Sequence, residues 1–388
     1  MTKPKSARTV SVSQGIGQDT SFGAVTPPLY LSSTYTFEGF GQAREYEYSR
    51  TRNPSRDQLA ATLASLEGGA LAIVTASGMA ALDLALSTLR ADDLLLAPHD
   101  CYGGSYRLIQ GRAERGHFKV LFVNQNDSLM LREGFGHRPR LVLVETPSNP
   151  LMRVVDIAAI ASMAREAGAK LVVDNTFLSP ALQNPLLLGA DYVVHSTTKY
   201  INGHSDVVGG ALVTADQADG EELSAWANLT GVTSSPFDAY LTLRGVRTLF
   251  PRMEAQQRAA MAIAEFLAPH PAVEHVYYPG LPADPGHTLA ASQQKGFGAM
   301  LSFETSLGGS ALQKFISTLR LFTLAESLGG VESLIAHPAT MTHLGMGEAA
   351  RATAGISDAL LRLSVGLEEP ADLIDDLSEA LDAGRAAP

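Results

Sequence analysis

The chain has 388 residues, of which 45% are hydrophobic and 18% are charged, and this length exceeds what one hydrophobic core usually holds. Its net charge of −11 comes without any long run of Lys or Arg, which excludes nucleic-acid phosphates as the main ligand. The composition therefore favours a soluble protein of two domains that acts on small molecules.

Cys101 is the only cysteine, so the chain can form neither an intramolecular disulfide nor a cysteine-based zinc framework. This usage is typical of a reducing cytoplasm. The polar start of the chain, residues 1–12, lacks an apolar signal segment, and no apolar run reaches the length that crosses a bilayer. We therefore expect a cytoplasmic protein with no membrane anchor and no nucleic-acid partner.

Residues 1–56 are rich in Ser, Thr, Gly and Pro and show no regular periodicity. A long segment of this kind usually has a function or wraps a partner. Its stretch 46–54 holds two tyrosines and two arginines just before a helix that Asn53 or Ser55 could cap. Because arginine clamps phosphates and carboxylates, this stretch is either a solvated basic loop or part of an anion site.

From residue 57 to 250 the sequence alternates between amphipathic helices and short apolar strands. The strands are continuous apolar runs, which predicts a mostly parallel sheet covered by helices on both faces, and hence a large α/β domain. Ligands of such domains collect at the carboxyl ends of the strands. The expected helices are 57–66, 78–89, 102–115 and 156–167, and the expected strands are 71–75, 94–97, 120–123, 141–145, 171–174, 192–196 and 211–213.

Residues 251–388 predict a smaller C-terminal α+β domain. A long helical stretch, 237–267, leads into it and is expected to break at Phe250-Pro251. The expected strands are 273–277, 299–303, 321–324 and 361–365, and the expected helices are 310–317 and 371–381.

Two turns after strands in the large domain are suited to ligand binding. Residues 76–81 open a helix with small side chains, and the exposed amides of such a helix start can hold a phosphate, although a simple tight turn explains the same residues. Tyr102 follows another strand on a glycine-rich turn, where its ring could lie on a planar ligand. The neighbouring Cys101 is better explained as a small buried filler than as a nucleophile.

Three charged residues occupy strands or strand ends. Lys199 follows an apolar strand and three hydroxyl residues, 196–198, where an amine would suit imine or proton-transfer chemistry; a lysine that extends into solvent is the alternative. Asp174 ends a run of buried aliphatic residues and must meet a cation or a hydrogen-bond donor. Arg362 occupies a buried strand position, so we expect a carboxylate partner, which a structural ion pair would also supply.

Pyridoxal phosphate uses all of these groups together. Its aldehyde binds a lysine, its ring nitrogen needs a carboxylate, its phosphate needs amides and hydroxyls, and its ring needs an aromatic face. The main alternative on such a sheet is a nucleotide-dependent oxidoreductase, which the lack of a glycine fingerprint after any strand disfavours. A catalytically silent oligomeric binding protein is a second alternative.

The same residues resemble the Cys/Met-metabolism family of enzymes that use pyridoxal phosphate. The likeness extends over essentially the whole chain and implies the fold type I architecture of these enzymes. That fold has a large, mostly parallel sheet domain with helices on both faces and a smaller C-terminal α+β domain. The motifs that carry the likeness are APHDCYGGSYR at 97–107, VDNTFLSPALQN at 173–184, HSTTKYINGHSD at 195–206 and ESLGGVESL at 326–334.

The resemblance implies roles for the cofactor-binding residues. Lys199 would bind the aldehyde of pyridoxal 5'-phosphate, Asp174 would pair with the ring nitrogen, and Tyr102 would stack on the ring and help to deprotonate the incoming amine. The implied ligands of the phosphate are Gly78, Met79, Ser196 and Thr198, joined by Tyr48 and Arg50 from the neighbouring subunit. This sharing implies a homo-oligomer, commonly a tetramer built as a dimer of dimers.

The resemblance also implies the substrates. An O-acylhomoserine, expected to be O-succinylhomoserine, and cysteine would be joined into cystathionine by γ-replacement, a step of methionine biosynthesis by transsulfuration. A γ-elimination enzyme that cleaves cystathionine is the alternative within the family. The implied substrate-binding residues are Arg362, Asn149 and Ser327 for the α-carboxylate, and Arg107 and Glu326 for the side-chain pocket. We expect no metal site, because His204 and Asp206 are better explained as braces of the loop after Lys199.

Overall fold

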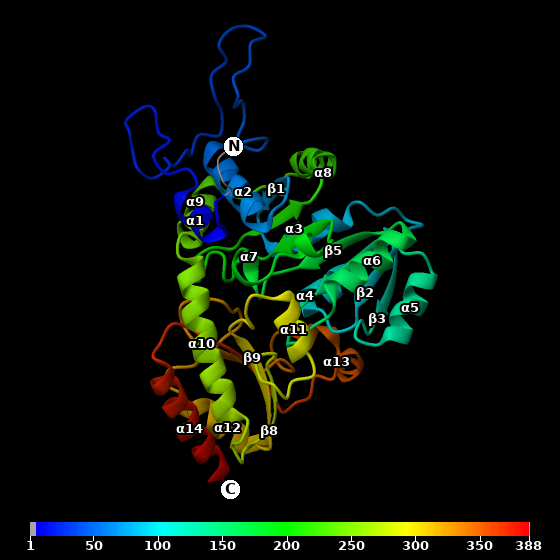
Figure 1. The fold of residues 1–388 in the computed structure, drawn as a ribbon, viewed down its shortest axis with the longest axis vertical. Coiled ribbons are helices and arrows are strands. Elements are labelled where there is room, and N and C mark those ends of the chain that lie inside the picture. Colours follow the sequence, from blue (N-terminus) through cyan, green and yellow to red (C-terminus); the bar gives the residue numbers. More distant parts are fainter. Residues whose placement is uncertain (1–4, 388) are drawn as a thin grey trace. The chain divides into compact units, whose positions relative to one another are not determined.

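The computed structural model describes residues 5–387, so residues 1–4 of the predicted N-terminal arm lie outside the described residues. The chain forms two compact units. The first extends to Thr88 and resumes from Lys170 to Phe250, and the second comprises Leu89–Ala169 and the chain from Pro251 onward. Figure 1 shows the elements of each unit in the colours of the sequence. The domain boundaries expected at residues 56 and 250 stay a prediction.

In the first unit, the parallel strands bring two candidate residues to one sheet edge. β5 and β6 run parallel, with Asp174 opposite Val194, whereas β7 is antiparallel to both of its neighbours. Asp174 and the turn that carries Lys199 therefore leave the sheet at the same edge, since each follows the carboxyl end of its strand. The strands of this unit are, in spatial order, β1 (Leu71–Thr75), β7 (Gly210–Thr214), β6 (Tyr192–His195) and β5 (Lys170–Asp174).

Helix α2 (Pro54–Glu67) has clear start and stop signals. The Asn53 side chain accepts hydrogen bonds from two amides of the first turn, and Gly68 ends the helix with a φ of 75°. Asn53, rather than Ser55, is thus the cap. The buried face of α2 packs on β1, β7 and α9 (Figure 1). The other helices of this unit are α1 (Ala7–Ser13), α3 (Gly78–Leu86), α7 (Ser179–Leu182), α8 (Gln217–Thr230) and α9 (Pro236–Val246), with the 3-10 turn η1 (Pro185–Leu188).

In the second unit, β2 runs parallel to β3 on one side and to β4 on the other. The ends of β2 and β4 therefore place the turns 99–102 and 146–150 at one edge. These strands are β2 (Leu94–Pro98), β3 (Lys119–Val123) and β4 (Leu141–Glu145), and the helices that accompany them are α4 (Gly103–Glu114), α5 (Ser128–Gly136) and α6 (Ile157–Ala167).

The second unit also contains the smaller sheet, in which β12 lies between β11 and β9. Arg362 lies on β12, opposite Ala336 and Ser302. Helices α12 (Gly309–Thr318) and α14 (Pro370–Arg385) pack together beside this sheet (Figure 1). The strand order is β10 (Thr323–Leu324), β11 (Leu334–Ala336), β12 (Leu360–Ser364), β9 (Met300–Thr305) and β8 (Val273–Tyr277). The remaining elements are α10 (Leu249–Leu267), α11 (His287–Gln293), η2 (Leu344–Met346) and α13 (Glu348–Ala354).

The fold is mixed α/β, with a large, mostly parallel sheet and a second, smaller sheet, as the sequence predicted. The expected break at Phe250-Pro251 is wrong: α9 ends at Val246, α10 begins at Leu249, and Pro251 lies in the first turn of α10, where a backbone N–H is not needed. Helices α5 and α8 were not expected. Among the described helices, none combines the length and the apolar character needed to span a membrane.

Candidate active site

The first turn of helix α3 is the predicted phosphate site in the first unit. Ser77 caps the helix, because its side-chain oxygen accepts a hydrogen bond from the Ala80 amide at 3.1 Å. The amides that precede Ala80 have no partners inside the helix and lie at its positive end. At Gly78 a Cβ atom would lie only 2.7 Å from the Cβ atom of Ser196. Glycine therefore lets the helix start, with Gly78 and Met79, approach the residue that follows β6.

Lys199 lies half-buried on the turn that follows β6. Its amide donates to the Ser196 carbonyl at 3.2 Å, and its carbonyl accepts from the Gly203 amide at 2.8 Å. Thr198 Oγ1 accepts from the Gly209 amide at 3.0 Å, which ties this turn to the residues before β7. The same short turn thus carries Lys199 and two phosphate-ligand candidates, Ser196 and Thr198.

The loop after Lys199 is braced by the two residues for which the sequence predicted that role. His204 Nδ1 lies 2.7 Å from the Asn202 carbonyl, and the Asn202 side chain donates to Asp206 at 2.8 Å. Within the described residues, no group of His, Cys, Asp or Glu side chains is arranged to hold a metal ion.

Asp174 ends β5, and Thr176 holds its carboxylate. Asp174 Oδ1 accepts from the Thr176 amide at 3.0 Å and from the Thr176 hydroxyl at 2.5 Å, and that hydroxyl accepts from the Ser196 amide at 2.9 Å. Burial raises the pKa of Asp174 above its ordinary value, whereas the Thr176 bonds and the nearby His195 oppose this shift. In the part of the chain that the structure describes, none of the hydrogen bonds of Asp174 uses Oδ2, which can therefore pair with a cation.

A buried acid and imidazole lie in the interior of the same unit. His195 Nε2 is 2.6 Å from Glu67 Oε1, and both side chains have no exposed surface. Asn175 donates to the same carboxylate oxygen at 2.9 Å, and Asn184 donates to the other at 3.4 Å. A buried carboxylate is costly unless it is paired, so these donors explain why polar residues follow β5 and end β6 inside the core.

Arg362 is held by two neutral acceptors in the second unit and is only 2% exposed. Its Nη1 donates to Asn149 Oδ1 at 2.9 Å, and its Nη2 donates to the carbonyl of Ser327 at 2.9 Å. Ser327 has a φ of 91°, a strained value for a residue other than glycine. The structure thus brings together the three predicted carboxylate-binding residues, and Ser327 takes part through its backbone.

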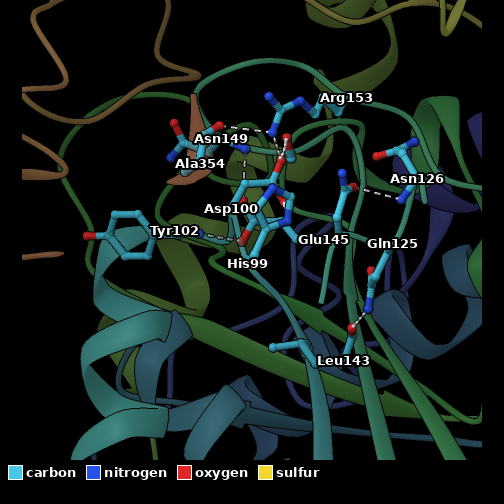
Figure 2. A network of polar contacts seen from close by, with 12 residues as sticks. His99, Asp100, Tyr102, Gln125, Asn126, Leu143, Glu145, Asn149, Arg153 and Ala354 are labelled. Carbon is cyan, nitrogen blue, oxygen red and sulfur yellow. Dashed lines mark hydrogen bonds and ion pairs between the residues drawn. The ribbon is translucent and has the colours of Figure 1, made fainter. Parts of the chain in front are cut away.

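Glu145 links Tyr102 to Asn149, as Figure 2 shows. Its Oε2 accepts from the Tyr102 amide at 2.9 Å, and its Oε1 accepts from the Asn149 amide at 3.0 Å. Tyr102 is 38% exposed, so part of the residue is accessible to a ligand. The ring also meets His343 edge to face, with centroids 6.5 Å apart.

His343 is a buried residue that contacts Asn149 from the opposite direction. Its Nε2 lies 3.0 Å from the Asn149 carbonyl, and its Nδ1 lies 2.8 Å from Thr342 Oγ1. Burial, followed by the charge of Arg362, lowers the pKa of His343 to about 4. His343 is therefore neutral near pH 7 and donates Nε2–H to the carbonyl.

The two residues predicted to line the side-chain pocket are both exposed. Arg107 lies on α4, one turn after Gly103, and its Nε donates to the Gly103 carbonyl at 3.2 Å. Its side chain packs closely over Gly345. Glu326 directly precedes Ser327. In residues 5–387 no hydrogen bond or ion pair joins Arg107 to Glu326, so their shared pocket stays a prediction.

Tyr48 and Arg50 lie on the N-terminal segment, whose loops extend in blue from the first unit in Figure 1. The Arg50 Cζ atom lies 5.8 Å from the centroid of the Tyr48 ring. Its Nη1 donates to the carbonyl and to the side-chain Oδ1 of Asn228, at 2.6 and 2.9 Å. Within its own chain, Arg50 is thus anchored to α8. Its role toward a neighbouring subunit stays a prediction.

Several residues that organise the site did not stand out in the sequence. Thr176 and Glu145 lie at the carboxyl ends of strands, where the sequence predicted that ligands collect. A search for donors and acceptors near each strand end would therefore have found them. The buried residues Glu67, His195 and His343 carry no local signal, because a helix, a strand and a loop supply them separately.

The groups gathered in the first unit fit pyridoxal phosphate. The α3 amides and the Ser196 hydroxyl are donors suited to a phosphate. The Thr198 hydroxyl donates to the Gly209 carbonyl at 3.2 Å and can join them by rotation of its O–H. The close approach of Gly78 to Ser196 leaves backbone rather than side chain at the helix start. The desolvated carboxylate of Asp174 gains from a cation, which a protonated ring nitrogen supplies.

Comparison with known proteins supports this assignment. The family model described as "Cys/Met metabolism PLP-dependent enzyme" matches residues 8–382. The chain is 57% identical to "Cystathionine gamma-synthase" of Escherichia coli over 97% of both chains, and 44% identical to "Cystathionine gamma-lyase" of Bacillus subtilis over 97% of this chain and 99% of the other.

A solved structure agrees. The crystal structure of cystathionine gamma synthase from Xanthomonas oryzae pv. oryzae in complex with cystathionine has a TM-score of 0.98 and 55% identity, with 99% of this chain and 100% of the other covered. These matches indicate the same cofactor as the strand-end lysine, the strand-end aspartate and the predicted phosphate site. The chain is a member of the Cys/Met metabolism family of PLP-dependent enzymes, and pyridoxal phosphate is its cofactor.

Proposed function

We propose that this chain catalyses the cystathionine gamma-synthase reaction. The reaction joins O-succinylhomoserine, or another O-acylhomoserine, to L-cysteine and gives cystathionine and the free acid, as a step of methionine biosynthesis by transsulfuration. The observation that carries the proposal is the 57% identity over 97% of the chain to a relative named for this activity. The solved relative with bound cystathionine, at 55% identity, supports the same substrate class.

The first unit would bind the phosphate, the ring nitrogen and the aldehyde of the cofactor. Gly78 and Met79 would give their amides to its phosphate, and the hydroxyls of Ser196 and Thr198 would add two more donors. Asp174 Oδ2 would pair with the ring nitrogen and keep it protonated. Lys199 would bind the aldehyde, and Tyr102 would supply the stacking face.

The buried guanidinium of Arg362 would receive the α-carboxylate of the amino acid substrate. Asn149 Oδ1 and the Ser327 carbonyl hold Nη1 and Nη2 in a fixed plane, so less side-chain entropy is lost on binding. A guanidinium can bind a carboxylate through two parallel N–H bonds, which suits this role. Arg107 would contact the distal carboxylate of a succinyl group, and Glu326 would line the same pocket.

Proton transfer would be the task of Lys199 and Tyr102. When bound, the cofactor supplies an electron sink for charge that develops at the substrate Cα. Tyr102 would take a proton from the incoming ammonium group, whose amine would then displace Lys199 from the aldehyde. The released Lys199 Nζ would move protons from Cα and Cβ. These transfers allow the acyl-oxygen group to leave Cγ. The cysteine sulfur then bonds to Cγ, and Lys199 returns the protons to Cβ and Cα.

The oligomer is also part of the proposal. Tyr48 and Arg50 would reach the phosphate bound by a neighbouring subunit, in a cytoplasmic homotetramer arranged as a dimer of dimers. Phe22 and Phe40, on the same segment, are 95% and 108% exposed. Apolar rings exposed to this extent favour burial against another chain.

A cystathionine gamma-lyase activity is the second candidate. The 44% identity to a relative of that name favours it, because the two reactions share the cofactor and the α-carboxylate site. Two of the three relatives carry the name of a synthase and the third that of a lyase. None of them supports a non-catalytic binding protein or an oxidoreductase.

The test measures cystathionine formation from O-succinylhomoserine with and without cysteine, and separately the breakdown of cystathionine. The proposed activity requires that cystathionine forms only with both substrates. Rapid breakdown with no synthesis would assign the lyase activity instead. The Lys199→Ala variant should lose the visible absorbance of the bound cofactor and at least about 10³-fold of the rate.

A further inference from the structure

Two turns of the second unit hold each other through reciprocal carboxylate contacts (Figure 2). They follow the parallel neighbours β2 and β4. Glu145, at the end of β4, accepts from the Tyr102 amide at 2.9 Å, and Asp100, just after β2, accepts from the Ser148 hydroxyl at 3.0 Å. Each turn therefore carries an acid that binds the other turn.

Asp100 fixes one side of this arrangement to the rest of the unit. Arg153 Nη1 donates to Asp100 Oδ2 at 2.9 Å and to the carbonyl of Ala354, the last residue of α13, at 3.0 Å. Charge-assisted bonds of this kind are stronger than neutral ones and have defined directions. The turn that bears Tyr102 is therefore also anchored through Asp100, independently of its bond to Glu145.

Glu145 differs from Asp100 because each of its oxygens receives a separate backbone amide. Oε2 binds the Tyr102 amide and Oε1 binds the Asn149 amide at 3.0 Å. A carboxylate is planar and its two oxygens are a fixed distance apart. It therefore sets the separation of the two backbone segments, which a pair of independent contacts would not do.

The position of Asn149 sets the position of the Arg362 guanidinium, which is proposed to bind the substrate carboxylate. The Asn149 amide is held by Glu145, its carbonyl by His343, and its Oδ1 receives Arg362 Nη1 at 2.9 Å. A shift of the Asn149 backbone would therefore turn the guanidinium or break its bond. Two bonds of Glu145 end on backbone amides of this site, and its proposed effect passes through these amides.

We propose that Glu145 is a positioning residue that fixes the Tyr102 ring and the Arg362 guanidinium relative to each other by bridging the amides of Tyr102 and Asn149. The inference rests on the proposed function, because it concerns how the α-carboxylate of an amino acid substrate is held. It assigns Glu145 to substrate discrimination rather than to the chemistry at Cα.

A buried carboxylate that binds backbone amides can also serve stability alone, and Asp376 provides the matched control. Asp376 on α14 is 3% exposed and accepts from the amides of Arg320, Leu321 and Phe322 at 2.9 to 3.3 Å. Like Glu145, it is a buried carboxylate that accepts from backbone amides in the second unit, and it also lies 3.9 Å from Arg320 Nε. These three bonds reach neither Tyr102 nor Asn149.

The experiment compares wild type, Glu145→Gln and Asp376→Asn as holoenzymes. Each is titrated with L-2-aminobutyrate and with its amide, L-2-aminobutyramide, and binding is followed by the visible absorbance of the cofactor. Aminobutyrate has no leaving group at Cγ, and the amide lacks the carboxylate charge. The ratio of the two dissociation constants therefore measures recognition of the carboxylate. Thermal unfolding and cofactor content are measured on the same samples.

Glu145→Gln should lower the preference for the acid over the amide by about tenfold, because glutamine offers one acceptor oxygen in place of two. Asp376→Asn should lower Tm and leave the preference unchanged. An unchanged preference in Glu145→Gln would overturn the proposal and make Glu145 structural. If Glu145→Gln does not fold, Glu145→Asp replaces it, because aspartate keeps the charge but is one methylene too short to bridge both amides. A lowered preference for the acid would again support the proposal, and an unchanged preference would overturn it.

A double-variant cycle tests the route of the effect. If Glu145 acts through Asn149 and Arg362, Glu145→Gln should change the preference much less in an Arg362→Gln background than in wild type. Equal changes in both backgrounds would contradict the proposed route. Cystathionine formation by wild type is measured separately, so a failure of the proposed activity is distinguishable from a failure of this inference.

Discussion

His195 Nε2 lies 2.6 Å from Glu67 Oε1, and neither side chain has any surface exposed to solvent. Glu67 is the last residue of α2, where both burial and the helix dipole make a carboxylate costly. The imidazole and the amides of Asn175 and Asn184 offset this cost. Because His195 directly precedes Ser196 and acts on the charge of Asp174, this pair connects the packing of α2 with two residues that are proposed to bind the cofactor.

The Glu67→Ala variant tests the importance of this pair for stability. Loss of the carboxylate removes the partner of the buried imidazole and one of the acceptors of Asn175 and Asn184, so the free energy of unfolding should fall by about 3 kcal/mol. Urea denaturation of the apoprotein measures the change. Asp382→Ala, which removes an exposed partner of Arg385, should change the value by less than about 0.5 kcal/mol. Equal losses in the two variants would refute this role of Glu67.

The Asp174→Asn variant should separate stability from cofactor binding. Burial raises the folded-state pKa of Asp174 above its unfolded value, so the ionised carboxylate destabilises the apoprotein at neutral pH, and this penalty disappears as the pH falls below the unfolded value. The apoprotein of Asp174→Asn should therefore have a Tm about 2–4 °C higher than wild type at pH 7.5, and the difference should shrink toward pH 4.

The same variant should bind pyridoxal phosphate at least about tenfold more weakly, because an amide cannot pair with a protonated ring nitrogen. Calorimetry of the apoproteins and titration with the cofactor measure the two effects. A lower Tm of the variant apoprotein at pH 7.5 would show that desolvation does not destabilise the protein at Asp174.

The Arg362→Lys variant should weaken substrate binding far more than it slows the chemistry. Lysine keeps the charge but cannot contact Asn149 Oδ1, the Ser327 carbonyl and a carboxylate in one plane. KM for O-succinylhomoserine should rise about 100-fold, with kcat changed by less than about fivefold. Steady-state kinetics measure both values, with Arg385→Lys as the surface control. An unchanged KM would exclude Arg362 from the carboxylate site.

The His343→Gln variant should make the protein less sensitive to acid. The folded-state pKa of His343 is lowered from 6.5 to about 4, so the neutral ring contributes stability that is present above pH 6.5 and lost as the pH falls toward 4. Between pH 6.5 and pH 4, the free energy of unfolding should fall less steeply in the variant than in wild type. The two slopes should differ by up to about 1.4 kcal/mol per pH unit. Urea denaturation at each pH measures the slope, and a slope equal to that of wild type would contradict the prediction.

Much of the fold was predictable because its signals are local. The strands expected between residues 71 and 214 were confirmed with small shifts at their ends, and Asn53 capped its helix as one of two expected candidates. Apolar runs and caps depend on neighbouring residues, so they are visible in the sequence without any knowledge of the fold. The break expected at Pro251 was wrong for a related reason, since proline is also tolerated in the first turn of a helix.

The sequence by itself also determined which chemistry is available, because a lysine, an aspartate and an anion seat each follow an apolar strand. Only the tertiary structure decided how these groups are held. Asn149 and Arg362 are 213 residues apart in the chain, and Glu67 and His195 are 128 apart. Contacts at such separations depend on strand order and on packing between elements, which no local pattern encodes. The bridge that Glu145 makes between Tyr102 and Asn149 exists for this reason, because β2 and β4 are distant in sequence and adjacent in the sheet.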